Sequence, residues 1–447
     1  MMKTARFRRF GILAAVLVVL ADLVLPACAA GGASTTISVL GIWTGDEATA
    51  FQAVLKGFMD DNPGITVNYT GTRALDQVLL TDVQKGQPPD IAVLPSPGDL
   101  AGYVRDQEVQ PLDGSLGARP GDSYSAQWLR LLQVGTGKLY AVPVKADLKS
   151  IIWYDPAKFG HPAPTTWAQL TAASDDLRAR GQAPWCVGLS ATPASGWPGT
   201  DWIEDILLHQ GDPAVYERWA AGLQPWTSDE VKKAWTTWGA LMTAPGSVRG
   251  GPTSALLTEY SDAGKAMFTN PPGCSLEHQA SFNVGEYRGF TASAGKPPQP
   301  GTGFDFFPFP SLEPGTPVAA PPNEVSADLA AMFQPGENAR KLMAYLAGDK
   351  GQAVWPARGS AFSADKTLLD KDVYRDPVST KIARTLSVSS LCFDASDLMP
   401  AKMSDAFNRA VLDYLADPSR LDALLANLDK VRTGIDRKDW LNVPCGG

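Results

Sequence analysis

The chain has 447 residues, 19% of them charged and 44% hydrophobic, a balance typical of folded globular proteins rather than disordered ones. Its length predicts two or three domains. The net charge of -8 at pH 7, with no basic stripe anywhere along the chain, argues against a nucleic-acid-binding protein.

The first 27 residues have the pattern of an export signal. A basic segment, KTARFRRF, precedes an apolar run, GILAAVLVVLADLVL, which is too short for a stable membrane span. The run ends in LPAC, which resembles a bacterial lipobox, so Cys28 is the expected site of lipidation. The alternative is an ordinary secretory peptide followed by an incidental cysteine. We expect a signal peptide at 1–27 and a lipid-anchored, flexible tether at 28–34.

Strands and helices alternate in the next segment. We expect strands at 35–43 and 65–69, and a third at 90–98 that runs into a loop, with helices starting at TGDE and spanning 74–85. This order predicts an α/β layer with a mostly parallel sheet. Ligands lie beyond the carboxyl ends of the strands in such sheets. Here those ends carry WTGDE, TR and PSP, which are polar and aromatic.

Three later segments are interpreted as crossings between lobes: the extended runs at 138–159 and 303–312, and the turn at 355–359. The remaining expected elements are a helix beginning at 165–170, a strand at 183–189, a helix ending at 208, helical segments at 219–242 and 338–346, and two helices within 404–431.

The stretch SGWPGTDWIED, residues 195–205, combines aromatic and acidic side chains in an unusual way. Flat aromatic faces beside carboxylates suit a ligand with apolar faces and hydroxylated edges, such as a sugar ring. A structural interpretation competes with this one: Thr200 or Asp201 could be the N-cap of a helix, with Trp202 as a core anchor. The other tryptophan-rich positions, Trp153, Trp235 and Trp238, are assigned to packing.

The order of these pieces resembles the extracellular solute-binding proteins of carbohydrate ABC importers, family 1, which include maltose- and α-glucoside-type receptors. The matching segments are GIWTGDEATAFQAVLKGFMDDNPGITVNYTGTR, GQPPDIAVLPSPG, VPVKADLKSIIWYDPAKF, PTTWAQL, SGWPGTDWIEDIL, MFTNPPGC and FDASDLMP. They span almost the whole chain after the signal, and WTGDE, GTR, PPDIAVLPSPG and GWPGTDWIEDIL look most like the α-glucoside branch.

The resemblance implies an α/β, two-lobed periplasmic-binding-protein-like fold of type II, with a ligand cleft between lobes joined by hinge crossings. Lobe 1 is expected at 35–144 plus 306–354, and lobe 2 at 145–305 plus 355–447. It further implies a monomer, anchored by lipid at the outer face of the cell membrane, that closes on a sugar and docks on a permease. No cofactor, metal or catalytic residue is expected.

The resemblance also implies a set of ligand residues. These are Trp43, Asp46, Glu47, Arg73, Ser96, Lys145, Asp147, Trp197, Asp201, Arg358 and Asp397. Charged groups would bind sugar hydroxyls, and tryptophan would cover the face of the ring. Several have simpler alternatives. Glu47 would also favour a helix N-terminus, Arg73 could pair with Asp76, Trp43 could belong to the core, and Lys145 could pair with Asp147.

Four cysteines remain after Cys28, namely Cys186, Cys274, Cys392 and Cys445. An even number in an exported protein predicts two disulfides, with three possible pairings. We favour Cys186–Cys274 and Cys392–Cys445, because each bond would join neighbouring segments of one lobe. With three histidines and no CxxC spacing, a zinc site has no support.

A secreted glycoside hydrolase is the competing function, because such an enzyme also needs two carboxylates beside a sugar-binding surface. The lipobox and the order of the receptor-like motifs favour a binding protein.

Overall fold

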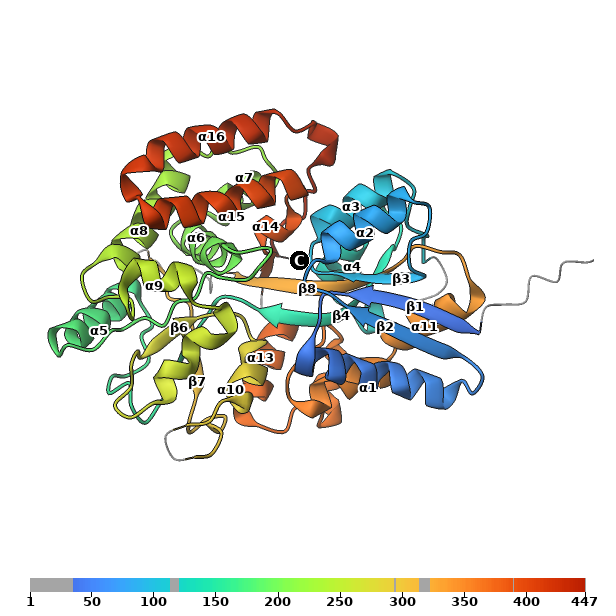
Figure 1. Cartoon of the computed structure of the whole chain (residues 1–447), viewed down its shortest axis with the longest axis horizontal. Helices are drawn as coiled ribbons and strands as arrows, with labels where there is room; N and C mark the ends of the chain where they lie inside the picture. The colour runs from blue at the N-terminus through green and yellow to red at the C-terminus, as the bar shows by residue number, and fades with distance from the viewer. Residues whose placement is uncertain (1–34, 113–119, 293–294, 313–321, 389, 447) are drawn as a thin grey trace, which may run out of the picture. The chain divides into compact units, whose positions relative to one another are not determined.

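The computed structural model describes residues 35–112, 120–292, 295–312, 322–388 and 390–446. The expected signal peptide, the tether and Cys28 lie outside the described residues. Figure 1 shows the arrangement of the helices and strands within the described part of the chain.

A large mixed sheet contains six described strands, in the order β2-β1-β3-β8-β4 with β9 paired to β8. Their bounds are β1 Thr36–Gly41, β2 Thr66–Gly71, β3 Ile91–Leu94, β4 Ala141–Leu148, β8 Asn323–Met332 and β9 Leu391–Phe393. Strand β1 is parallel to β2 and β3, but β8 is antiparallel to both β3 and β4. The expected parallel pairing is confirmed for β1, β2 and β3, and β9 is also parallel to β8. The two antiparallel pairings arise because β8 enters the sheet by a return crossing and not through a helical βαβ connection.

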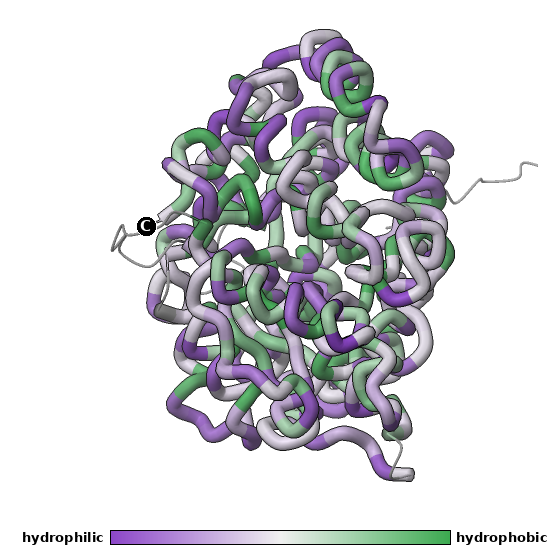
Figure 2. Tube along the Cα trace, turned by 90° about the vertical axis from the view of Figure 1, so that its left-hand side faces the viewer, coloured by the Kyte–Doolittle hydropathy of each residue, from purple (hydrophilic) through white to green (hydrophobic). Residues whose placement is uncertain are grey.

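Helices cover both faces of this sheet, so its central strands are apolar on both sides. Ile91 and Val93 of β3 pack into one core with α1 (Gly45–Asp61) and α11 (Glu337–Ala347). The alternate residues Ala92 and Leu94 pack into a second core with α2 (Leu75–Gln84), α3 (Pro97–Arg105) and α4 (Ala126–Leu132). This alternation follows from the two-residue period of a strand. Figure 2 shows the hydrophobic segments along the same trace.

A small antiparallel sheet, in the order β6-β5-β7, lies next along the chain. Its strands are β5 Ile151–Tyr154, β6 Leu276–His278 and β7 Asp305–Pro308. The chain passes from β4 of the large sheet straight to β5 of the small one, and it later runs from β7 to β8. The extended runs at 138–159 and 303–312 therefore join the two sheets. The third expected crossing, at 355–359, contains a short 3-10 turn, Pro356–Arg358. The exact residue limits of the two lobes stay a prediction.

The strand expected at 183–189 is absent from the structure of these residues. Pro184 has no amide hydrogen, and Trp185 makes only isolated bridges with Val248 and Leu276. Trp185 thus bridges to two different segments, each through a single residue, and no continuous ladder of strand hydrogen bonds forms.

Helices pack around the small sheet and follow β8. They are α5 Trp167–Ala179, α6 Trp197–His209, α7 Pro213–Ala220, α8 Asp229–Thr243, α9 Gly251–Leu257, α10 Asn283–Gly289, α12 Asp349–Val354, α13 Pro377–Val388, α14 Ala395–Leu398, α15 Ala401–Ala416 and α16 Leu421–Thr433. The helical segment expected at 219–242 is in fact α7 and α8, separated by a turn that contains Pro225. The two C-terminal helices, α15 and α16, are confirmed.

The packing role of three tryptophans is confirmed. Trp153 is buried against Tyr287, with ring centroids 5.4 Å apart, whereas Trp235 and Trp238 are buried against Tyr414 of α15. The favoured disulfides are confirmed as well. The Cα atoms of Cys186 and Cys274 are 5.3 Å apart, and those of Cys392 and Cys445 are 4.4 Å apart.

The start of α5, expected within 165–170, has a capping box. The Thr166 hydroxyl accepts from the Gln169 amide at 3.3 Å, and the Gln169 side chain accepts from the Thr166 amide. We expect Thr166→Ala to lower the free energy of unfolding by about 1 kcal/mol, because the helix loses one N-terminal acceptor. Urea denaturation measures this loss. Thr166→Ser, which keeps the hydroxyl, is the control, and an equal loss in both variants would contradict the assignment.

Glu277 of β6 is 2% exposed and accepts from the Tyr287 hydroxyl at 2.7 Å. Burial raises the pKa of Glu277 from 4.5 to about 8. The folded state therefore holds this proton to higher pH than the unfolded state. As a result, the free energy of unfolding should fall as pH rises from about 4.5 to 8, by at most about 1.4 kcal/mol per pH unit for this group.

The matched variants are Glu277→Gln, which cannot titrate, and Glu337→Gln, on the exposed first turn of α11. Urea denaturation between pH 5 and 8 should show a shallower decline in Glu277→Gln than in the unmodified protein. Glu337→Gln should keep the original decline. Parallel curves for the unmodified protein and Glu277→Gln would contradict this account of the buried carboxyl.

Candidate ligand-binding site

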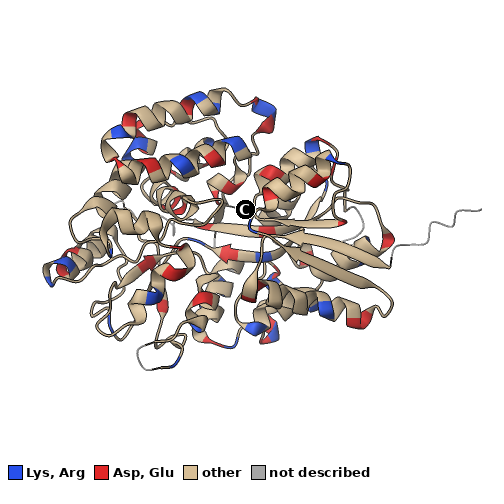
Figure 3. Ribbon diagram, viewed as in Figure 1, with Lys and Arg blue, Asp and Glu red and all other residues tan. Residues whose placement is uncertain are grey.

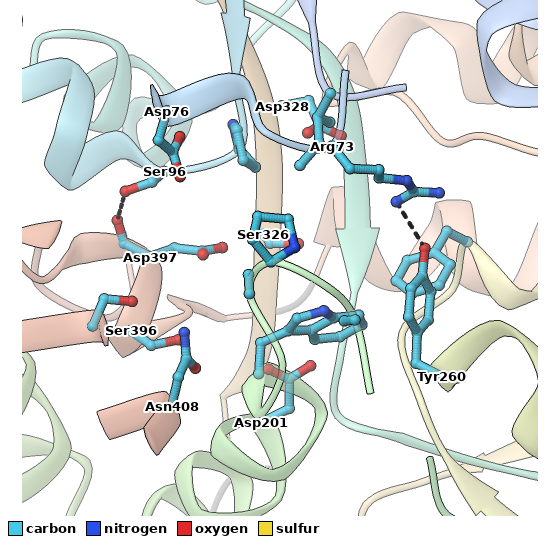
Figure 4. A pocket seen from close by; sticks show the side chains of 18 of the residues that line it. Arg73, Asp76, Ser96, Asp201, Tyr260, Ser326, Asp328, Ser396, Asp397 and Asn408 are labelled. Carbon is cyan, nitrogen blue, oxygen red and sulfur yellow. Dashed lines mark hydrogen bonds between the residues drawn. The ribbon is translucent and has the colours of Figure 1, made fainter. Parts of the chain in front are cut away.

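A cavity of about 410 Å³ lies beside the carboxyl ends of β1, β2 and β3, where the sequence analysis places a ligand. Residues of these strand ends meet residues of β4, α6, β8, α14 and α15 around it (Figure 4). Its volume falls in the range of small-molecule sites.

Lys145 of β4 is the centre of one charged group in the cavity wall. Its Nζ atom lies 3.0 Å from Glu47 Oε1, 3.5 Å from Asp147 Oδ2 and 3.8 Å from Asp328 Oδ2. Burial alone would lower the pKa of Lys145, but these three carboxylates outweigh burial and raise it. The ammonium group is therefore charged, and the three carboxylates around it also line the cavity. The expected pairing of Lys145 with Asp147 is present, and both residues also line the cavity.

Lys149, the residue that directly follows β4, is the centre of a second charged group. Its Nζ atom lies 3.1 Å from Asp201 Oδ1, and it also bonds the carboxylate of Asp394. Burial raises the pKa of Asp201 to about 7, against the opposing effect of Lys149. Asp201 Oδ2 has no hydrogen-bond partner among the described residues, although it is buried. Asp201 Oδ2 is thus an acceptor that can bind a hydroxyl group of a ligand in the cavity.

Three aromatic side chains line the cavity beside these charges. The ring of Trp197 lies 4.9 Å from that of Tyr260 and 6.0 Å from that of Phe282, both at steep angles. Lys149 Nζ lies 5.6 Å from the centroid of the Trp197 ring. Because its neighbours contact it edge to face, Trp197 is held in place and stays partly exposed. It is a rigid apolar surface next to hydrogen-bonding groups.

Helix α6 brings Trp197 and Asp201 to the cavity, and its N-cap is Gly196. The expectation of Thr200 or Asp201 as N-cap is wrong. Gly196 has φ 112°, which favours glycine, and a Cβ atom there would lie 2.3 Å from the carbonyl oxygen of Asn408 in α15. Tight packing of α6 on α15 thus sets the start of the helix. Trp202, on the opposite side of α6, is the core anchor, 2% exposed against Trp185.

Two hydrogen bonds connect the strand ends with later segments of the chain. Arg73 Nη1, after β2, donates to the Tyr260 hydroxyl at 3.0 Å, and Ser96, after β3, donates to the Asp397 carbonyl oxygen at 3.0 Å (Figure 4). Arg73 therefore bonds Tyr260, 187 positions away, and not the nearby Asp76 that was its alternative partner. Both bonds lie at the cavity, so a ligand there contacts groups from distant parts of the sequence.

The structure brings most of the expected ligand residues together. Those that line the cavity are Trp43, Glu47, Arg73, Ser96, Lys145, Asp147, Trp197, Asp201 and Asp397. Trp43 also belongs to the core, packed edge to face on Trp355 at 4.7 Å. Two of the expected residues are placed elsewhere. Asp46 is exposed on the first turn of α1, and Arg358 is exposed in the turn Pro356–Arg358.

Three important cavity residues escaped the sequence analysis. Asp328 is a charged residue inside an otherwise apolar run, ADLAAMF, and Lys149 is the third charge of the extended run VPVKADLKSIIW, so both were recognisable in the sequence. Tyr260 had no such signal, because the segment from Tyr260 to Phe268 is an irregular helical stretch whose position depends on tertiary packing.

Comparison with known proteins decides the family. The model of the bacterial extracellular solute-binding protein family matches residues 43–353. The chain belongs to this family. It is 33% identical to the "Osmoprotective compounds-binding protein GgtB" of Synechocystis sp., over 85% of this chain and 88% of that one. It is 32% identical to the "Alpha-glucosides-binding periplasmic protein AglE" of Rhizobium meliloti, over 87% of this chain and 85% of that one.

Solved structures show the same two-lobed fold. The GacH receptor of Streptomyces glaucescens, solved with acarbose, superimposes with a TM-score of 0.67 at 14% identity, over 90% of this chain and 99% of that one. As a member of this family, the chain is an extracellular solute-binding protein.

None of the described helices is both long and apolar enough to cross a membrane. Acidic and basic side chains are interspersed along the helices visible in Figure 3.

Proposed function

We propose that this protein is the sugar receptor of an ABC importer, and that it binds an α-glucoside or another short oligosaccharide in the cavity. The observation that carries the proposal is that Trp197, Asp201 and Lys149 line the same cavity as the ion pair of Glu47 and Lys145. Charge-assisted hydrogen bonds suit hydroxyl groups, and an aromatic face suits the C–H face of a pyranose ring.

The names of two relatives support the choice of ligand class. AglE is named for α-glucosides, and GgtB for osmoprotective compounds. The identities of 32% and 33% cover most of each chain, so we extend this class of small hydroxylated ligand to the present protein.

The cavity residues also suit a receptor that closes on its ligand. Glu47 and Arg73 follow strands of the large sheet, whereas Trp197 and Asp201 belong to α6. We assign the first pair to lobe 1 (35–144 plus 306–354) and the second to lobe 2 (145–305 plus 355–447). A ligand that contacts both lobes binds the closed form more tightly than the open form, and only such a difference shifts the equilibrium between them.

The delivery step and the cellular location belong to the same proposal. The closed, sugar-loaded monomer would dock on the permease subunits of an importer. The export signal at 1–27 would direct export and be removed, and the acylated Cys28 would then hold the protein at the outer face of the cell membrane.

Calorimetric titration tests the proposed function. The panel contains maltose, trehalose, sucrose, longer α-glucans, β-linked disaccharides and monosaccharides, and every sample is analysed for hydrolysis afterwards. Tight binding of one class without turnover is the expected result. Failure of every sugar to bind would overturn the carbohydrate assignment, and hydrolysis would favour the glycoside hydrolase instead.

A further inference from the structure

Three buried carboxylates meet behind the cavity, next to the Lys149 group. They are Glu204 of α6, Glu324 of β8 and Asp394, the N-cap of α14. One oxygen atom from each lies within 4.8 Å of the others. Glu204 and Glu324 are fully buried, and Asp394 is 1% exposed. Helix α6, strand β8 and the start of α14, which are distant in sequence, therefore place three carboxyl groups together in the protein interior.

Only part of this group has hydrogen-bond partners. Glu204 Oε2 accepts from the Ala395 amide at 2.7 Å, and Asp394 accepts from Lys149, from the Ser396 hydroxyl and from the Asp397 amide. In contrast, both carboxylate oxygens of Glu324 and the Oε1 atom of Glu204 have no partner among the described residues. A buried carboxyl oxygen without a partner is unfavourable, and more so when it is charged, so these three oxygens require a bound proton or a cation.

The basic side chains nearby already have carboxylate partners, and of the three carboxylates only Asp394 is among these partners. Lys149 bonds both Asp201 and Asp394. His278 lies 2.7 Å from Asp205, on the same helix as Glu204, and Asp205 also accepts from the Ser150 hydroxyl. Among the described residues, Glu204 and Glu324 thus have no ion pair within 4 Å, although the charge of Lys149 lies near enough to act on both.

We propose that Glu204, Glu324 and Asp394 form a buried calcium site. The donors are carboxylate oxygens alone, which suit a hard cation and not zinc or copper. Calcium accepts irregular and bidentate carboxylate geometry, whereas magnesium retains several water molecules and needs a near-octahedral shell. Since the unpaired oxygens lie in a fully buried setting, calcium fits the site better than magnesium.

A cation here would link the site to the cavity. It would join α6, β8 and α14, and Asp394 would connect it through Lys149 to Asp201 in the cavity wall. The calcium site nevertheless stands apart from the sugar assignment, because calcium binding can be measured without any sugar.

The experiment measures calcium in the purified protein by mass spectrometry, then removes metal with a chelator and titrates CaCl₂ by calorimetry with thermal unfolding in parallel. We expect about one calcium ion per chain and a midpoint raised by several degrees. Glu324→Gln and Glu204→Gln should bind calcium at least about 100-fold more weakly, a loss of about 2.7 kcal/mol. Glu337→Gln, at an exposed position in α11, is the matched control and should bind normally.

Measurements on the unmodified protein decide the question even if a variant fails to fold. Absence of calcium from the protein, no heat on titration and an unchanged unfolding midpoint would overturn the calcium site. In that case the carboxyl groups would hold protons, and Glu324→Gln would be at least as stable as the unmodified protein at neutral pH. Calcium binding that survives in both Glu324→Gln and Glu204→Gln would overturn the location.

Discussion

Lys149→Met is expected to lower the free energy of unfolding by about 3–5 kcal/mol, the cost of breaking a buried charge group by removal of one partner. Lys149 is 6% exposed, and its ammonium group bonds both Asp201 and Asp394. Methionine has a similar length, so it keeps most of the packing and removes the charge. The two carboxylates would then be left buried without their shared cation. Urea denaturation at pH 7 measures the loss.

Lys56→Met is the matched control, because Lys56 pairs with Asp60 on the exposed surface of α1 at 2.7 Å. Exposed pairs of this kind contribute about 0.3–0.5 kcal/mol. A loss below about 1 kcal/mol in Lys149→Met would show that the buried group is not a main source of stability at the cavity.

Trp197→Ala is expected to weaken sugar binding about 10- to 100-fold, which corresponds to about 1.4–2.7 kcal/mol. The reason is the loss of a rigid apolar face that Tyr260 and Phe282 hold in place beside the charged groups. Trp197 is partly exposed at the cavity, so its removal should affect the affinity more than the fold. Calorimetric titration with the best-binding sugar of the panel measures the change.

Trp167→Ala provides the comparison for this prediction. Trp167 is also partly exposed and packs on Phe309, with centroids 5.8 Å apart, but it does not line the cavity. Its replacement should leave sugar affinity within about twofold of the original. Equal affinities in the two tryptophan variants would remove Trp197 from the proposed site.

The sequence was most informative where periodicity and strand ends coincide. Alternating strands and helices predict β1, α1, β2 and α2 close to their observed bounds, because each has an apolar face with a recognisable period. The strand expected at 90–98 is shorter, since β3 ends at Leu94 and Pro97 already begins α3. Polar residues at the ends of these strands, such as Glu47 and Arg73, do line the cavity.

The remaining features depend on tertiary contacts. Gly196 begins α6 because the backbone of α15 approaches it closely, and no local cap residue indicates this. The antiparallel entry of β8 depends on the return from the small sheet. In the sequence, Lys149 is recognisable only as one of three charges in an extended run, and its partners, Asp201 and Asp394, are brought to it by folding.

The stretch SGWPGTDWIED satisfies both of its interpretations at once. Trp202 is a core anchor, whereas Trp197 and Asp201 line the cavity from the first turns of the same helix. A helix with one face against the core and one end at a cavity makes both roles possible for residues five positions apart.

A crystal structure with the tightest-binding sugar tests the central claim most directly. The account predicts that one pyranose ring lies against Trp197 and that its hydroxyls lie within hydrogen-bond distance of Asp201 and of Glu47 or Lys145. A sugar bound elsewhere on the protein, or one that contacts only the α6 side of the cavity, would contradict the account.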